Sequence, residues 1–298
     1  MDNLPDQCEL CPRACGASRA SGETGYCGEA SRVRVARAAL HMWEEPCISG
    51  ASGSGTVFFS GCNLKCVFCQ NHGISAGGAG KAVSVERLSG IFMELQDKGA
   101  GNINLVTPSH FAPQIRAAVE MSRKAGLRVP IVYNTSCYEN TGTLKRLEGT
   151  VDIYLPDFKY MDPKISGRYS GAPDYFAAAS AALKEMVRQQ PFPVFDGGGL
   201  MEKGVIVRHL ALPGCTEDSK NVIKYLYETY GDSIYISIMN QYTPMPHVSC
   251  PELQRRLTDA EYDELVDFAI GIGVENGFVQ EGGTAEESFI PEFDNEGV

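Results

Sequence analysis

Three cysteines, Cys62, Cys66 and Cys69, have the spacing in this chain that most strongly indicates chemistry. They form a C-x3-C-x2-C pattern directly after a short apolar run at 56–59. Closely spaced thiolates are typical ligands of iron–sulfur clusters. Three thiolates on a four-iron cluster leave one iron open, whereas a structural zinc ion normally takes four protein ligands. The pattern predicts such a cluster; the alternatives are three buried free thiols, or a zinc loop with a distant fourth ligand.

A second group of cysteines lies near the N-terminus and follows the pattern C-x2-C-x3-C-x11-C. Its members are Cys8, Cys11, Cys15 and Cys27. Four thiolates suit either structural zinc or an auxiliary iron–sulfur cluster. About twenty residues cannot bury a core of their own, so a metal would hold this segment together. We call residues 8–27 the N-terminal knob; the alternative is a knob without metal.

The elements that must position the cysteine loop alternate between strand and helix. Short apolar runs predict six strands, at 56–59, 103–106, 130–133, 151–155, 205–212 and 234–239. Ser84, Thr216 and Thr258 are expected to cap the helices that follow three of them. Strands alternating with helices indicate an α/β fold with a parallel sheet. We expect a partial (β/α)6 barrel with the small Cys-rich metal-binding knob at its N-terminus. A Rossmann sheet is the competitor, but no G-x-G-x-x-G follows the first strand.

Composition divides the chain into three parts. Residues 1–50 form the N-terminal Cys-rich segment, 51–280 the barrel, and 281–298 an acidic tail rich in Gly, Glu and Asp. Such a tail is expected to be solvated and partly disordered, although it could instead dock a basic partner.

The bulk charge and the N-terminal sequence narrow the partners and the compartment. The net charge is −11, with 37 acidic and 26 basic residues. This balance argues against nucleic acid and against an anionic membrane surface as partners. No signal peptide and no apolar stretch long enough to span a membrane are expected. Eleven cysteines in a chain without an export signal favour metal binding in a reducing, cytoplasmic compartment.

The cysteine loop, continued by Gln70 and Asn71, resembles the signature of the radical SAM superfamily. With Phe68 inside the motif, it is most similar to the activating enzymes of glycyl radical enzymes, typified by pyruvate formate-lyase activating enzyme. The cysteine pattern at 8–15 and the segment 41–46 resemble the PflX-like paralogues of that activase. The resemblance extends from about residue 8 to about residue 246.

This resemblance implies a cofactor site. In the family, the three cysteines hold a [4Fe-4S] cluster, and S-adenosylmethionine chelates the open iron through its amino and carboxylate groups. Other segments of the family contact the cofactor or a nearby monovalent cation. The matching residues here are Phe68 beside the adenine, Asn134 and Thr135, Asp157 and Lys159, and Arg208.

Two segments depart from the family pattern. The family often has Gly-Gly-Glu after the second strand, where it binds the amino group of the cofactor; this chain has Val-Thr-Pro-Ser-His at 106–110. The activase has a His near the end of the sixth strand, whereas the segment 239–244 contains none. Recognition of the amino group must therefore differ, and the substrate is open.

The resemblance implies that the reduced cluster cleaves S-adenosylmethionine to a 5′-deoxyadenosyl radical, which abstracts hydrogen, by analogy from a glycine of a partner protein. The electron donor would be a flavodoxin or a ferredoxin. Two alternatives stay open: radical modification of a peptide or small molecule, and a non-catalytic iron–sulfur protein for electron transfer.

Overall fold

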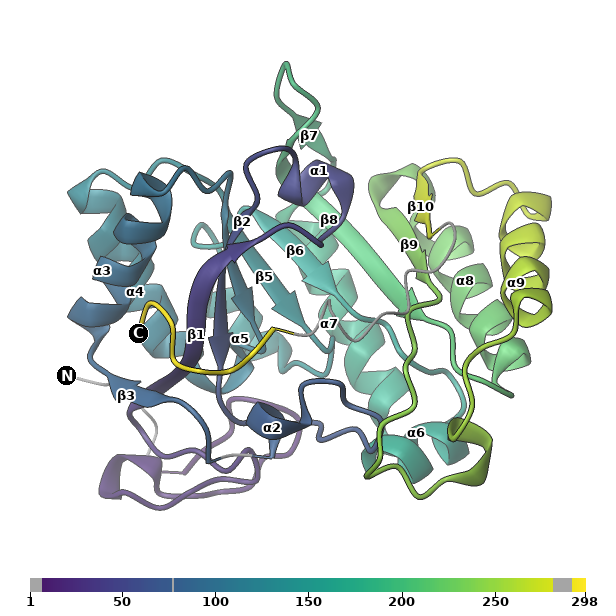
Figure 1. The fold of residues 1–298 in the computed structure, drawn as a ribbon, viewed down its shortest axis with the longest axis horizontal. Coiled ribbons are helices and arrows are strands. Elements are labelled where there is room, and N and C mark those ends of the chain that lie inside the picture. The colour runs from purple at the N-terminus through teal and green to yellow at the C-terminus, as the bar shows by residue number, and fades with distance from the viewer. Residues whose placement is uncertain (1–6, 77, 281–290) are drawn as a thin grey trace.

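A computed structural model describes residues 7–76, 78–280 and 291–298 (Figure 1). Its strands are β1 (Val33–His41), β2 (Ser54–Phe59), β3 (Lys81–Val83), β4 (Ile103–Val106), β5 (Ile131–Thr135), β6 (Ile153–Pro156), β7 (Val194–Phe195), β8 (Met201–Leu210), β9 (Tyr235–Met239) and β10 (Gly277–Val279). Its α-helices are α1 (Pro46–Ser49), α2 (His72–Ser75), α3 (Val85–Asp97), α4 (Ala112–Ala125), α5 (Thr141–Arg146), α6 (Pro163–Ser170), α7 (Tyr175–Gln189), α8 (Thr216–Tyr230) and α9 (Asp259–Gly271).

The six predicted strands are confirmed, and they form the parallel part of one sheet. The order along the sheet is β10-β9-β8-β6-β5-β4-β2-β1-β3, and the neighbours from β2 to β10 are all parallel. β10 adds a seventh parallel strand beside β9. The two ends of this order, β3 and β10, do not pair with each other, so the sheet is an open, partial barrel. The expected α/β class is therefore confirmed.

Apolar stripes pack the helices against the sheet. On α3, the residues Leu88, Ile91, Phe92 and Leu95 recur at helical spacing, and all four are buried. Figure 1 shows α3 and α4 together at one end of the sheet and α8 and α9 at the other. The core consists mainly of two clusters, one around β2 and β4 with α3 and α4, and one around β5, β6 and β8 with α7 and α8.

Helix starts agree with the sequence at two of three positions. The Ser84 hydroxyl accepts a hydrogen bond from the amide of Arg87, and Thr258 forms a capping box with Glu261. The expectation for Thr216 is wrong: it is the first residue of α8, and Cys215 occupies the N-cap without a side-chain hydrogen bond. Glu217 and Asp218 in the first turn still place negative charge at this helix end.

β1 ties the N-terminal segment to the barrel. The sequence boundary at residue 50 falls between α1 and β2, yet β1 pairs antiparallel with β2 from Val35 to His41. β3 pairs with the opposite edge of β1, but only at residues 33–35. Backbone groups of β1 beyond residue 35 therefore face outward and need another partner.

The C-terminal residues supply that partner. The amide of Asn295 donates to Ala36 O (3.0 Å), and the amide of Ala38 donates to Glu296 O (2.8 Å). Phe293 packs against Phe58, with 5.4 Å between ring centroids. The expectation of a solvated tail is wrong for residues 291–298, because they satisfy the open edge of β1. The rest of the predicted tail lies outside the described residues.

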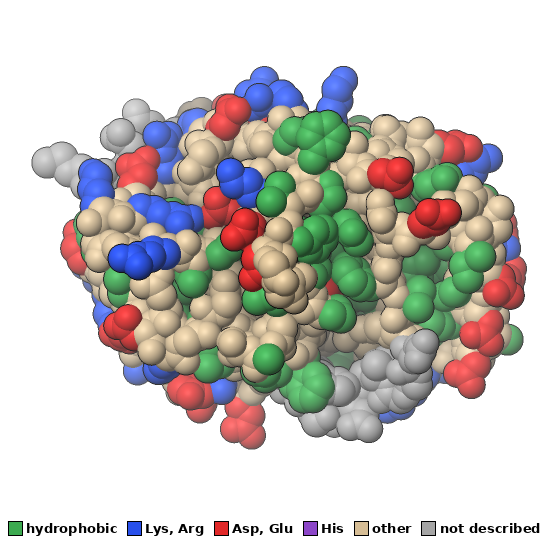
Figure 2. Space-filling model, turned by 90° about the horizontal axis from the view of Figure 1, so that it is seen from above, with side chains coloured by type: hydrophobic (Ala, Val, Ile, Leu, Met, Phe, Trp, Pro, Cys, Tyr) green, Lys and Arg blue, Asp and Glu red, His purple; other side chains and the backbone are tan. Residues whose placement is uncertain are grey.

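Seen from above, one face of the molecule has hydrophobic side chains gathered in its middle and acidic side chains scattered around them (Figure 2). Among the described residues, no helix is long and apolar enough to cross a membrane.

The capping box of α9 gives a stability prediction. We expect Thr258→Ala to lower the free energy of unfolding by about 1 kcal/mol, because the amide of Glu261 loses its acceptor at the helix start. Thr258→Ser is the matched control, since it keeps the hydroxyl and should retain most of the stability. Urea unfolding of the three proteins measures the difference. Equal midpoints for the Ala and Ser variants would contradict the prediction.

Candidate functional site

A cavity of about 210 Å³ lies where the parallel strands end. The cysteine loop after β2 forms one wall, and residues at the ends of β4, β5, β6, β8 and β9 form the others. The carboxyl ends of parallel strands meet at one edge of a sheet, which is where β/α barrels carry their chemistry. The predicted site residues in its lining are Cys62, Cys66, Phe68, Cys69, Asn134, Thr135, Asp157, Lys159 and Arg208.

The three loop cysteines all face this cavity, and hydrogen-bond donors point at their sulfurs. The amide of Leu64 lies 3.3 Å from Cys62 Sγ, and the Ser170 hydroxyl lies 3.0 Å from Cys66 Sγ. Burial, reinforced by neighbouring sulfurs, raises the pKa of Cys62 and raises that of Cys69 to about 12. A thiolate at these partly buried positions therefore needs a positive partner such as iron. The donor set fits the three-cysteine cluster that the spacing predicts.

Among the described residues, no three Cys, His, Asp or Glu side chains already enclose a position for a single metal ion. A single tetrahedral ion draws its sulfur ligands to within about 3.8 Å of one another, as follows from Zn–S bonds of about 2.3 Å. A four-iron cluster takes one cysteine per iron, which keeps the thiolates further apart. The open arrangement of the loop cysteines is therefore compatible with a cluster.

Arg208 is the centre of the polar group of residues that shares the cavity lining with the cysteines. Its Nε donates to Asp157 Oδ1 (2.7 Å) and its Nη2 to Asn134 Oδ1 (2.7 Å). Its Nη1 donates to Glu44 Oε2 (2.9 Å), and Lys159 Nζ donates to Asp157 Oδ2 (3.0 Å). One guanidinium thus joins groups from β5, the end of β6 and the segment before α1. The three strand-end motifs predicted from the sequence are brought together.

The charges in this network stabilise one another. Burial opposes ionisation of Asp157, but the positive charges of Arg208 and Lys159 outweigh it and hold the pKa of Asp157 below its ordinary value. Burial likewise disfavours the charged Lys159, yet the Asp157 carboxylate raises the pKa of Lys159. Arg208 and Lys159 are therefore cations at neutral pH, held at the cavity wall where a carboxylate ligand can meet them.

Glu44 and Glu45 are site residues that the sequence reasoning did not assign. Glu44 lines the cavity and forms an ion pair with Arg208. It also accepts a hydrogen bond from Asn104 Nδ2 (2.8 Å). Glu45 lies 4.0 Å from Arg208. Burial raises the pKa of both carboxyls, and the charge of Arg208 opposes this rise. Two adjacent acids before a proline in a largely apolar stretch were the available signal, because buried carboxylates need a cation.

Phe68, within the cysteine loop, is surrounded by aromatic side chains. Tyr160, Tyr169 and Tyr242 meet its ring edge-on, with centroids 6.3–6.4 Å away. Asn71 Oδ1 and Ser136 Oγ also belong to cavity-lining residues, and both atoms are buried without a hydrogen-bond partner among the described residues. Unpaired polar atoms in a cavity wall fit a polar cofactor that supplies the missing partners.

The segment that replaces Gly-Gly-Glu also reaches the cavity. Thr107 follows β4 and has φ of 59°, a left-handed conformation that is uncommon for threonine. Nearby, the hydroxyls of Ser109 and Thr135 both donate to Glu139 Oε1. Glu139 is buried, and its Oε2 has no partner among the described residues. A carboxylate is thus present behind this wall, although it comes from the segment after β5.

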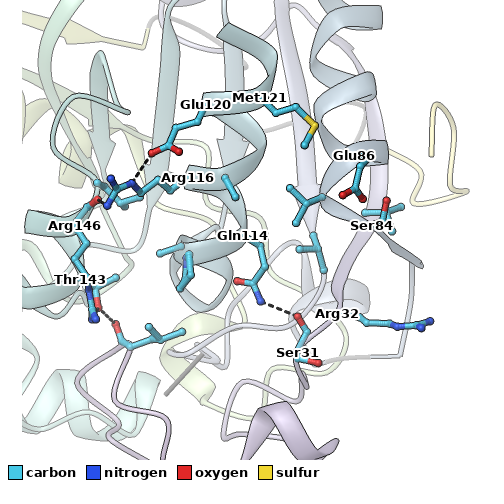
Figure 3. A pocket seen from close by; sticks show the side chains of 18 of the residues that line it. Ser31, Arg32, Ser84, Glu86, Gln114, Arg116, Glu120, Met121, Thr143 and Arg146 are labelled. Atoms are coloured by element: carbon cyan, nitrogen blue, oxygen red, sulfur yellow. Dashed lines mark hydrogen bonds and ion pairs between the residues drawn. The ribbon is translucent and has the colours of Figure 1, made fainter. Parts of the chain in front are cut away.

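The N-terminal cysteines do not line the cavity. The structure places Cys8, Cys11, Cys15 and Cys27 in the knob, behind the cysteine loop. A larger hollow of about 1070 Å³ lies outside the sheet, between the knob, α3, α4 and α5 (Figure 3). Gln114 donates to Ser31 O and Thr143 donates to Leu10 O across it. This hollow has no cysteine and none of the predicted site residues in its lining, so the chemistry belongs to the smaller cavity.

Residues 56–226 match the model of the Radical SAM superfamily. The match covers more than half of the chain and includes the cysteine loop and the strand-end groups of the cavity. The chain therefore belongs to the radical SAM superfamily, whose enzymes use an iron–sulfur cluster and S-adenosylmethionine for radical chemistry.

Individual proteins are similar to this chain in sequence or in fold. The chain is 26% identical over 279 residues to uncharacterized protein MJ0674 of Methanocaldococcus jannaschii, which covers 90% of this chain and 75% of that protein. Its fold is similar to Streptococcus suis SuiB bound to S-adenosylmethionine, with a TM-score of 0.50, 14% identity, and coverage of 74% of this chain and 48% of SuiB. HydG, the FeFe-hydrogenase maturase of Carboxydothermus hydrogenoformans, gives a TM-score of 0.50 at 12% identity, covering 79% of this chain and 59% of HydG. The chain thus spans about half the length of these solved structures.

The buried Glu139 gives a pH prediction. Burial raises its pKa from 4.5 to about 7, and the hydrogen bonds from Ser109 and Thr135 only partly oppose this. Between these pH values the folded state holds one more proton than the unfolded state, so the free energy of unfolding falls as pH rises. We expect wild type to lose stability relative to Glu139→Gln from about pH 4.5 to 7. Urea unfolding across this range measures the difference; parallel curves would contradict the prediction.

Proposed function

We propose that this protein cleaves S-adenosylmethionine at a [4Fe-4S] cluster held by Cys62, Cys66 and Cys69, and uses the radical to abstract hydrogen from a peptide or protein. The observation that carries the proposal is that the three cysteines line one cavity with Asn134, Asp157, Lys159 and Arg208. When bound, the cluster and cofactor supply the electron and the 5′-deoxyadenosyl radical; the chain's own residues bind, orient and exclude water.

The proposed roles follow from position and charge. Lys159 and Arg208 present positive charge to the carboxylate of the cofactor, while Asp157 fixes both cations in place. Asn71 and Ser136 offer unpaired polar atoms to its amino and hydroxyl groups. Phe68 borders the adenine, and the tyrosines around its ring keep that pocket apolar.

A macromolecular substrate suits the mouth of the cavity. Trp43 belongs to the lining yet is 64% exposed, and its neighbour Met42 is 45% exposed. An exposed aromatic beside a reactive cavity is typical of a surface that contacts a partner. The structure of SuiB bound to its precursor peptide SuiA is similar to this chain, with a TM-score of 0.51. We therefore favour a peptide or a glycine of a partner protein over a small molecule.

The finer assignment is to the PflX-like paralogues of the glycyl radical activases. It rests on the cysteine pattern of the knob and on the segment 41–46, which the structure places at the cavity through Glu44. A cytoplasmic flavodoxin or ferredoxin is the proposed electron donor. A non-catalytic electron-transfer protein is the competing reading, but it gives no reason for Asp157, Lys159 and Arg208 to converge on the cysteines.

The proposal predicts a product. After anaerobic reconstitution and reduction, the wild-type protein should convert S-adenosylmethionine to 5′-deoxyadenosine, detected by mass spectrometry. Cys66→Ala should lose the brown cluster absorption and the product while keeping its far-UV circular dichroism. Cys47→Ala, outside the cavity, is the matched control and should retain both. A Cys66 variant that cleaves the cofactor at the wild-type rate would contradict the assignment of the cluster ligands. A reduced wild-type cluster that forms no product would favour a role in electron transfer.

A further inference from the structure

The N-terminal knob is ordered without a core that explains its order. Among the described residues 7–32, the only helical element is a single 3-10 turn, Arg19–Ser21. Its own hydrophobic cluster consists of just Cys8, Leu10 and Ala17. So small a core contributes little by itself, so the order of the knob must come from its contacts with the barrel and from any ligand that joins its cysteines. All of its cysteines are free thiols.

Thiols converge inside the knob. Gly25 separates two of them: a Cβ added there would lie 3.2 Å from Cys15 Sγ and 3.5 Å from Cys27 Sγ. The thiols of Cys8 and Cys15 are in hydrogen-bond contact, and Cys11 interacts electrostatically with Cys8 and Cys27. Three of the sulfurs are therefore neighbours and Cys11 lies near them, although among the described residues no three of these side chains surround a single metal position in this conformation. Four thiolates are a closed, tetrahedral donor set of the kind that structural zinc takes.

A buried cation accompanies these sulfurs. Arg19 is completely buried, and its guanidinium donates to Ala30 O (2.6 Å) and His110 O (2.6 Å). Its Nη1 also lies 3.9 Å from Cys8 Sγ. Among the described residues, no carboxylate lies within ion-pair distance of Arg19; the acid Glu29 pairs with Arg34 at 3.8 Å and interacts with Arg19 only at longer range. A buried guanidinium needs negative charge close by, and zinc held by four thiolates carries a net charge of −2.

The knob is also joined directly to the cysteine loop. The amide of Cys62 donates to Cys27 O at 3.2 Å. Gly61, with φ of +80°, makes this approach possible, because a Cβ there would lie 2.7 Å from Cys27 O. The position of Cys62, the first cysteine of the loop, therefore depends on the position of the knob backbone at Cys27.

Arg13 makes a second connection. Its guanidinium donates to Asn63 O (2.8 Å) and Leu64 O (3.3 Å) in the loop, and to Ser170 O (2.9 Å) at the end of α6. The ring of Tyr26, also in the knob, lies 4.2 Å from the guanidinium carbon. Arg13 sits between two of the four cysteines in sequence, so its position depends on how they are held.

We propose that Cys8, Cys11, Cys15 and Cys27 bind one zinc ion, that Arg19 balances the charge of this tetrathiolate, and that the zinc holds the cysteine loop in place through Cys27 and Arg13. The inference does not depend on the proposed reaction, because zinc content and loop order are measured without turnover. Binding releases the thiol protons and needs no redox partner.

Elemental analysis tests the metal. Wild type should contain one zinc per chain, and zinc-edge X-ray absorption should show four sulfur neighbours at about 2.3 Å. Cys15→Ser, at the one exposed cysteine of the four, should lose the zinc, whereas the control Cys47→Ser should keep it. Nitrogen or oxygen neighbours, a second iron–sulfur cluster in place of zinc, or no metal beyond the loop cluster would each overturn the zinc assignment. The absorption measurement needs only wild type, so it decides the question even if the variant does not fold.

Hydrogen exchange tests the link to the loop. Without zinc, the amides of residues 62–69 should exchange about fivefold faster, the factor expected from losing one hydrogen bond of ordinary strength. Arg13→Met should produce a similar increase while the zinc is retained, and Arg128→Met, on the exposed surface between α4 and β5, is the control. Unchanged exchange at residues 62–69 in both zinc-free protein and the Arg13 variant would overturn the proposed coupling.

Discussion

The site depends on one partly buried guanidinium, which is 13% exposed. Arg208 lies on β8 and binds Asp157, Asn134 and Glu44, which come from three other parts of the chain. Removing a charge of this kind from water is costly, and only several well-placed acceptors make it tolerable. Asp157 in turn is held ionised by Arg208 and Lys159, which keep its pKa below the ordinary value. The network therefore fixes the relative positions of β5, β6 and β8 at the edge where they face the cysteine loop.

The opposite wall is positioned by contacts of a different kind. The cysteine loop has little regular structure, and Lys65 within it has φ of 57°. Backbone hydrogen bonds hold the loop instead. The amide of Cys62 donates to Cys27 O, and the amide of Val67 donates to Tyr169 O at 2.8 Å. Asn63 Nδ2 donates to Tyr138 O at 2.7 Å. The loop is thus tied to the knob on one side and to the segments around α6 on the other, so its cysteines face the cavity.

Much of this arrangement follows from local sequence. Alternating apolar strands and amphipathic helices predict the parallel sheet, and strand ends of a parallel sheet must share an edge, which brings Asn134, Asp157 and Arg208 together. Long-range pairings could not be predicted in this way. The pairing of the antiparallel strand β1 is one example. The C-terminal residues on the edge of β1 and the contact of Glu44 with Arg208 are two more, and each joins parts of the chain at least 164 residues apart. Nothing in the local pattern of either partner specifies the other. The cap at Thr216 failed for a smaller reason, a shift of one residue at the helix start.

We propose that the Arg208 network and the cysteine loop form one cofactor site. The most direct measurement is a titration of the reduced protein with S-adenosylmethionine, followed by the EPR spectrum of the cluster. We expect a cofactor-dependent change in the wild-type spectrum. For Arg208→Lys we expect an apparent dissociation constant about tenfold higher or more, because lysine cannot bind Asp157, Asn134 and Glu44 together. Arg123→Lys, an ion-paired arginine on α4, should titrate like wild type. An Arg208 variant that binds the cofactor as tightly as wild type, with the same spectral change, would show that Arg208 does not take part in cofactor binding.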